Sequence, residues 1–163
     1  MRKTSFGLTL AATCAAVLAS LPAQAQLVSS TNPQAIKAAV EAQGWPATLN
    51  TPDDQNPYIE SKRNDMKFLV LFMNCDDDHK NCKTLQYYMG FSDAKETSLD
   101  RLNEWNKTKR FARAYRDKDG DPVLEMDLDL DFKGIPSENV NESLVTWAAL
   151  MDAYHAHLFP DTE

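Results

Sequence analysis

Glycine, cysteine and basic residues are all scarce in this sequence. It has 5 glycines and 3 cysteines in 163 residues, and its 17 Lys and Arg residues are outnumbered by 24 Asp and Glu residues. The few glycines form no phosphate-binding loop, and no nucleophile has an evident base nearby. The net charge of −7 argues against binding to nucleic acid or to anionic lipid, because both ligands need a basic surface. Beyond the N-terminus, no stretch is apolar enough to span a membrane.

The N-terminus carries the three parts of a secretory signal. Arg2 and Lys3 form a basic start, an apolar run covers residues 6–21, and Ala23-Gln24-Ala25 supplies the small residues of a cleavage site. We therefore predict a signal peptide over residues 1–25, cleavage after Ala25 and a mature domain over residues 26–163. Loss of Arg2 and Lys3 changes the net charge from −7 to −9. The mature protein is predicted to be periplasmic or secreted, without stable membrane insertion.

Cys75 and Cys82 are the two cysteines of the mature chain, and such a pair in an exported protein favours a disulfide. Residues 66–75 and 82–91 are rich in aromatic and branched side chains, so both are predicted strands. A bridge across this short loop would stabilise the fold by about 2.5 kcal/mol. If the cysteines lie opposite each other in an antiparallel pair, every residue pair on one face of the hairpin is apolar. A shift of the pairing by one residue would place apolar residues of one strand opposite mixed residues of the other. The pairs on the apolar face would be Phe72 with Leu85, Val70 with Tyr87, Phe68 with Met89 and Met66 with Phe91.

The loop between the cysteines also suggests a metal site. Asp76–Asp78 and His79, together with the two cysteines, could ligate zinc or copper. A structural zinc site usually has closer cysteine pairs and four clear ligands, and a redox pair favours a C-x-x-C spacing. We therefore interpret the bridge as structural and predict neither a metal nor a cofactor.

Capping residues and apolar spacing predict three helices. The first begins after Asn32 with Pro33 and ends before Gly44. The second is capped by Thr97 or Ser98, and its apolar face has Leu99, Leu102 and Trp105. The third is capped by Ser137, and His155 and His157 lie on different faces near its end. Its apolar face comprises Val140, Leu144, Trp147, Met151, Tyr154 and Leu158. Further strands are predicted over residues 45–50, 57–62 and 111–116.

The stretch "DKDGD", residues 117–121, resembles the start of a calcium-binding loop. Such a loop also needs glycine at its sixth position and an acid at its twelfth, where this chain has Pro122 and Leu128. We therefore predict a hairpin turn in which Gly120 adopts a positive φ angle.

The following residues alternate with a period of two, as in a strand with two different faces. Leu124, Met126, Leu128, Leu130 and Phe132 would share one face, and Glu125, Asp127, Asp129 and Asp131 the other. Arg110, Arg113 and Arg116 are the expected neighbours of these acids. The acidic face is either a solvated surface that discourages edge pairing, or a docking surface for a basic partner or a weak divalent cation.

The stretch "LNEWNKTKRFARAYRDKDGDPVLEMDLDLD" resembles the YbjN family, described as bacterial sensory transduction regulators. The likeness extends over almost the whole mature chain and includes Trp105-Asn106, Arg110-Phe111 and the turn at residues 119–121. It implies an α+β domain similar to type III secretion chaperones, with an antiparallel sheet flanked by about three helices. It implies no catalytic residues. The candidate interaction surface comprises Trp105, Asn106, Arg110, Asp127, Asp129 and Asp131.

Three functions are consistent with these features. The leading hypothesis is an exported, non-enzymatic protein-binding or regulatory domain with a protein partner, and by analogy with the chaperones a homodimer. The alternative is a metal-binding module that uses the acidic strand or the loop from Asp76 to His79. A third hypothesis is a hydrolase that uses Asp127 and Asp129, which would require a pocket and a separation of their pKa values.

Overall fold

The computed structural model describes residues 27–160, so the predicted cleavage after Ala25 lies outside the described residues. Its helices are α1 (Pro33–Ala42), α2 (Leu99–Thr108) and α3 (Ser137–Leu158). Its strands are β1 (Leu27–Val28), β2 (Ala47–Asn50), β3 (Tyr58–Arg63), β4 (Met66–Met73), β5 (Thr84–Gly90), β6 (Arg113–Arg116), β7 (Pro122–Asp129) and β8 (Ile135–Pro136). Within this part of the chain, no helix is both long enough and apolar enough to cross a membrane.

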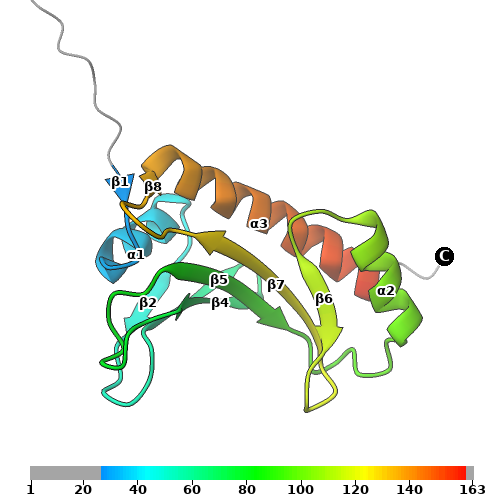
Figure 1. Ribbon diagram of the computed structural model, residues 1–163. Helices are drawn as coiled ribbons and strands as arrows, with labels where there is room; N and C mark the ends of the chain where they lie inside the picture. Colours follow the sequence, from blue (N-terminus) through cyan, green and yellow to red (C-terminus); the bar gives the residue numbers. More distant parts are fainter. Residues whose placement is uncertain (1–26, 161–163) are drawn as a thin grey trace, which may run out of the picture.

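Six of the strands form one antiparallel sheet in the order β2-β3-β4-β5-β7-β6. The helices of the described residues all lie on the same side of this sheet (Figure 1). The sheet therefore has a face covered by helices and an open face. The predicted fold class, an α+β domain with helices flanking an antiparallel sheet, is confirmed.

The predicted register of the central hairpin is confirmed. Phe72 pairs with Leu85 and Val70 with Tyr87, in line with the disulfide between Cys75 and Cys82 beyond the strand ends. Side chains along β4 then alternate strictly between the two faces. Three are buried on the covered face, and the residues between them are at least partly exposed on the open face. The buried residues are Phe68, Val70 and Phe72.

Helix α3 supplies most of the covering layer. Its predicted apolar face is buried, and Trp147 stacks on Tyr87 of β5 with ring centroids 5.7 Å apart. The Tyr87 hydroxyl lies 2.8 Å from Oγ of Ser143, and burial raises the pKa of Tyr87 to about 12. Aromatic packing between the sheet and this helix therefore forms the centre of the core.

The helix ends agree with the sequence in two cases and differ in one. Oδ1 of Asn32 accepts a hydrogen bond from Ala35 N in α1, and Oγ of Ser98 accepts one from Arg101 N in α2. In α3, however, Pro136 occupies the N-cap position, and Ser137 is already helical and makes no capping bond. A further correction concerns Leu99. It is 61% exposed, whereas Leu102 and Trp105 are the buried residues of α2.

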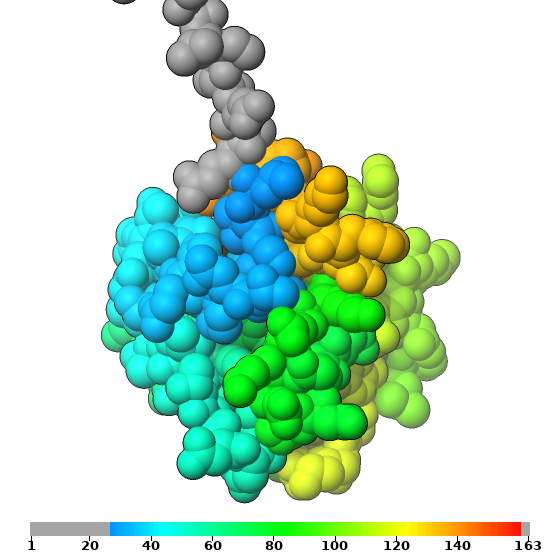
Figure 2. Space-filling view, turned by 60° about the vertical axis from the view of Figure 1, so that its left-hand side comes forward, coloured from blue at the N-terminus to red at the C-terminus, as the bar shows by residue number. Residues whose placement is uncertain are grey.

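A second, two-stranded sheet was not predicted. Strand β1 pairs with β8, which joins the start of the domain to the beginning of α3. Figure 2 shows this N-terminal segment (blue) next to residues near 130–136 (orange) and above the disulfide loop (green). Gly134, with φ 83°, permits the contact, because a Cβ there would lie only 2.2 Å from the carbonyl oxygen of Val28.

The turn at residues 117–121 is a hairpin turn, as predicted. Oδ1 of Asp117 accepts hydrogen bonds from Asp119 N and Asp121 N, and Gly120 has a φ of 87°.

Strand β7 is shorter than the alternating sequence pattern predicted. It stops at Asp129, after which Phe132 adopts a φ of 62° and is 97% exposed. The predicted place of Phe132 on the buried face is therefore wrong, because the chain leaves the sheet before reaching it.

Candidate binding surface

The open face of the sheet carries an apolar strip at its centre. Leu69, Leu71 and Met73 of β4 point away from the helices, and each is at least partly exposed. Tyr88 of β5 lies beside Leu69 in the register, and Tyr58 of β3 lies beside Leu71. We call these five residues the apolar strip. Leu69, Leu71 and the two tyrosines are each half-buried, and none of the three helices within residues 27–160 covers them.

Charges of opposite sign border the apolar strip. On β7, Asp127 and Asp129 are exposed, and Asp127 accepts a hydrogen bond of 2.9 Å from Gln86. At the opposite corner, Lys62 of β3 lies directly beside Lys67 of β4, and both are exposed. Like charges in directly opposite positions destabilise a strand pair, so these lysines are not explained by sheet stability.

The basic corner is also hollowed. A pocket of about 350 Å³ lies there, lined by both lysines, Leu69, Glu60 and Ser61 among others. The Ser61 hydroxyl is buried and has no hydrogen-bond partner among the residues that the structure describes. With two lysines and one glutamate, the lining is net positive.

Glu125 departs from the predicted row of exposed acids, because its side chain is buried. Its Oε2 accepts hydrogen bonds from Nε and Nη2 of Arg113 at 2.9 and 2.6 Å, and its Oε1 accepts one from the Tyr115 hydroxyl at 2.5 Å. The hydrogen bond to Glu125 raises the pKa of Arg113. Partial burial and the same carboxylate raise the pKa of Tyr115. Arg113 is thus the predicted basic neighbour, and it neutralises this acid.

The other arginines have different roles. Arg116 donates from its guanidinium to the backbone carbonyls of Lys95 and Thr97. Arg110 is exposed and lies over the ring of Phe111, with Cζ 4.9 Å from the ring centroid. Neither arginine reaches the acids of β7 by any hydrogen bond or ion pair within residues 27–160.

Trp105 and Asn106 have structural positions. Trp105 is 0% exposed and packs edge-on against Tyr154 at 4.9 Å, so its predicted place on an interaction surface is wrong. Asn106 donates to the carbonyl oxygen of Ala114 at 2.8 Å and accepts from its N–H at 2.7 Å. Because β6 is an edge strand, this amide side chain completes backbone bonds that a further strand would otherwise make.

Asp131 also departs from the predicted row of acids. It lies past the end of β7, where its Oδ1 accepts a hydrogen bond from Phe132 N and its own N–H donates to Oδ1 of Asp129. Of the six predicted surface residues, only Asp127 and Asp129 therefore lie on the open face of the sheet.

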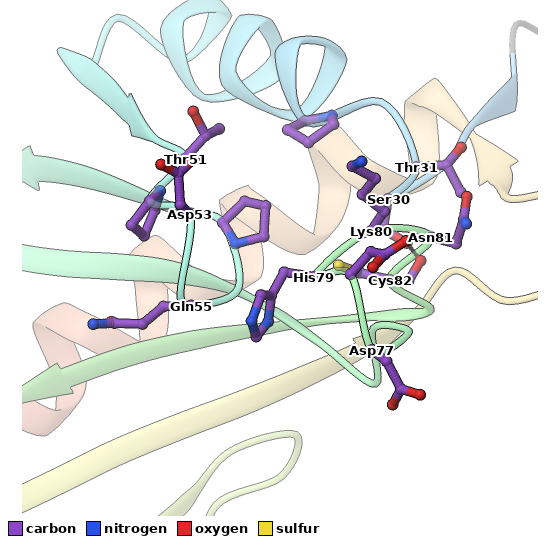
Figure 3. A pocket seen from close by; sticks show the side chains of 14 residues that line it. Ser30, Thr31, Thr51, Asp53, Gln55, Asp77, His79, Lys80, Asn81 and Cys82 are labelled. Carbon is purple, nitrogen blue, oxygen red and sulfur yellow. Dashed lines mark hydrogen bonds between the residues drawn. The ribbon is translucent and has the colours of Figure 1, made fainter.

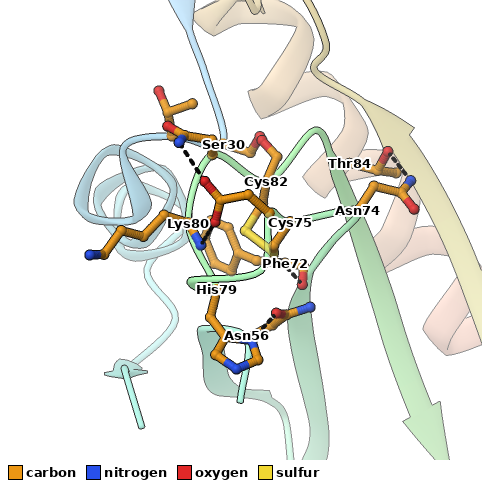
Figure 4. Close-up of a disulfide and its surroundings, with 12 residues drawn as sticks. Ser30, Asn56, Phe72, Asn74, Cys75, His79, Lys80, Cys82 and Thr84 are labelled. Carbon is orange, nitrogen blue, oxygen red and sulfur yellow. Dashed lines mark hydrogen bonds between the residues drawn. A yellow bond between two sulfur atoms is a disulfide. The ribbon is translucent and has the colours of Figure 1, made fainter. Parts of the chain in front are cut away.

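The loop between the cysteines is held together by its own hydrogen bonds (Figure 4). Asp76 accepts from the N–H of Lys80 and from the Asn81 side chain, and these bonds lower the pKa of Asp76. His79 Nδ1 lies 2.8 Å from Oδ1 of Asn56. The Ser30 hydroxyl donates to the carbonyl of Cys82 and ties the loop to the N-terminal segment.

An open pocket of about 690 Å³ lies beside this loop (Figure 3). Polar side chains and three prolines line it, and they come from the N-terminal segment, from the turn between β2 and β3, and from residues 77–82 of the disulfide loop. Within residues 27–160, no group of three or more His, Cys, Asp or Glu side chains could hold a metal ion. Both sulfurs belong to the disulfide, and Asp76 is occupied by the loop itself. The metal-binding hypothesis therefore receives no support from this loop.

The described residues thus define an α+β domain whose six-stranded sheet has helices on one face and a charged, partly apolar open face. The chain belongs to the YbjN family, whose model, described as "Putative bacterial sensory transduction regulator", matches residues 32–160. No curated protein matches the chain.

Proposed function

We propose that this protein is an exported, non-enzymatic regulatory domain that binds a polypeptide on the open face of its sheet. The observation that carries the proposal is the apolar strip with charges at both of its borders. An apolar centre with a polar rim is the usual composition of a surface that binds another protein. The regulatory description of the family supports a binding role.

The disulfide supports the export part of the proposal. Disulfides form and persist mainly in oxidising compartments outside the cytoplasm. Cys82 is 3% exposed, so the bridge is protected inside the fold. Together with the predicted signal peptide, it favours a periplasmic or secreted protein. Mass spectrometry of the natively produced protein would test this, because a retained N-terminus or free thiols would contradict export.

Affinity capture with matched variants tests the binding role. Leu71→Asp places a charge in the middle of the apolar strip, whereas Val145→Asp changes an exposed apolar residue on α3, on the other side of the molecule. We expect wild type and Val145→Asp to retain the same identified polypeptide, and Leu71→Asp to lose it. Circular dichroism would establish that both variants are folded. Equal retention by both variants would overturn the proposal.

A further inference from the structure

We infer that the occupant of the open face is an amphipathic helix of a partner protein, with an acidic first turn on Lys62 and Lys67 and a basic last turn on Asp127 and Asp129. This inference rests on the proposed function and specifies the chemistry of the partner.

The register fixes how far apart the two charged corners lie. Leu71 of β4 pairs with Gln86 of β5, which pairs with Asp127 of β7, so these three residues lie in one row across the sheet. Met73, Thr84 and Asp129 form a second row in the same way. Lys67 precedes Leu71 by four residues on a strand two places away from β7. With about 3.3 Å per residue and about 4.8 Å between strands, the corners are separated by about 16 to 24 Å, the larger value for Lys62, which lies one strand further from β7. A helix of about 11 to 16 residues spans this distance.

Leu69 and Tyr88 of the apolar strip lie between the two corners, and Leu71 lies beside them. The line from Lys67 to Asp127 crosses β5 at the level of Tyr88, with Leu69 and Leu71 on the neighbouring strand. A helix on this line would therefore place one apolar stripe on the strip and reach a charged corner at each end. The pocket beside the lysines provides space for a side chain of its first turn.

The charge order that we infer for the partner helix, acidic at its start and basic at its end, is also the order that stabilises a helix. Acidic residues in the first turn and basic residues in the last turn stabilise a helix through its dipole. The same order places carboxylates on the lysines and ammonium groups on the aspartates. A partner helix with this order is therefore stabilised by its own charges and by those of the surface.

A second copy of the same face fits less well. Two facing copies related by a twofold axis place lysines against aspartates only if the corners exchange across the axis. Such a dimer would also bring together two chains that each have a net charge of −7, and their repulsion opposes association.

Two synthetic helices of about 14 residues, equal in composition and held helical by the same side-chain staple, test the inference. One has Glu in its first turn and Lys in its last turn, and the other has one Glu and one Lys in each of these turns, with the same leucine stripe, so that neither direction of binding matches its ends to the corners. We expect the first to bind wild-type protein about ten-fold more tightly, measured by fluorescence anisotropy. In the variant with Lys62→Glu and Lys67→Glu, both corners are acidic, and the preference should be lost. Leu71→Asp should weaken both peptides and Val145→Asp neither.

Three results would overturn the inference. The first is that the two peptides bind equally or that neither binds. The second is a preference that is unchanged in the variant with two acidic corners. The third is a dimer that Leu71→Asp dissociates in sedimentation. If affinity capture still depends on Leu71, the first two results leave the proposed function intact. If capture does not depend on Leu71, the proposed function fails as well.

Discussion

The two faces of the same sheet differ in what their side chains contact. On the covered face, Phe68 and Tyr87 pack against Trp147 of α3 and are fully buried. On the open face, the adjacent residues Leu69 and Tyr88 lie side by side on neighbouring strands and remain partly exposed. Neighbours in sequence therefore have separate tasks. One set stabilises the fold, and the other is available to a partner.

The largest expected effect comes from truncation on the covered face. Trp147→Ala removes a fully buried ring that contacts both Phe68 and Tyr87, so we expect a loss of about 3 to 5 kcal/mol in unfolding free energy. Tyr88→Ala on the open face is the matched control and should cost about 1 kcal/mol or less. Urea unfolding would measure both values. Similar losses for the two variants would contradict the division between the faces.

Loss of the disulfide should have the next largest effect, and it concerns both faces because the bridge closes the hairpin that fixes their register. The double variant Cys75→Ser, Cys82→Ser should be less stable by about 2.5 kcal/mol. Thermal or urea unfolding of the variant and of reduced wild type would measure this, and the two should agree. A variant as stable as the oxidised protein would contradict the structural role of the bridge.

Alkaline pH should destabilise the covered face through Tyr87. The pKa of Tyr87 is raised to about 12, so its contribution to stability is complete below pH 10 and is lost as the pH rises from 10 through 12. Each such tyrosine can add a slope of up to about 1.4 kcal/mol per pH unit. Tyr87→Phe should therefore show a shallower decline of unfolding free energy in this range. An unchanged slope would argue against a buried, protonated hydroxyl.

The smallest expected effect concerns the sheet edge, which belongs to neither face. Asn106→Ala removes two hydrogen bonds to the backbone of Ala114, and we expect a loss of about 1 to 2 kcal/mol in unfolding free energy. Asn103→Ala, on an exposed position of the same helix, is the control and should be nearly neutral. If both variants behave alike, the edge is not completed by Asn106.

Much of the covered face could be predicted from the sequence because its signals are local. Apolar spacing located α3, and the cysteine pair fixed the β4–β5 register, which then determined which residues face the helices. The open face was harder to predict. Lys62 and Lys67 meet only through the β3–β4 pairing, and no residue pair in the sequence signals that register.

The errors at the predicted interaction surface have the same origin. The motif around Trp105 and Asn106 indicated importance, but the sequence could not show that one residue fills the core and the other completes an edge strand. Glu125 is buried under Arg113 and Tyr115 of the adjacent strand β6, and the turn alone did not determine which of the predicted arginines would face the acids. In each case the role depends on how the elements pack together, which residue spacing alone does not determine.

Photo-cross-linking in cells that make this protein would test the role of the open face most directly. A benzophenone amino acid would replace Leu71 on the apolar strip in one variant and Val145 on α3 in the other. Our account predicts a cross-link to a defined polypeptide from position 71 and none from position 145. A partner cross-linked from position 145 but not from position 71 would contradict it.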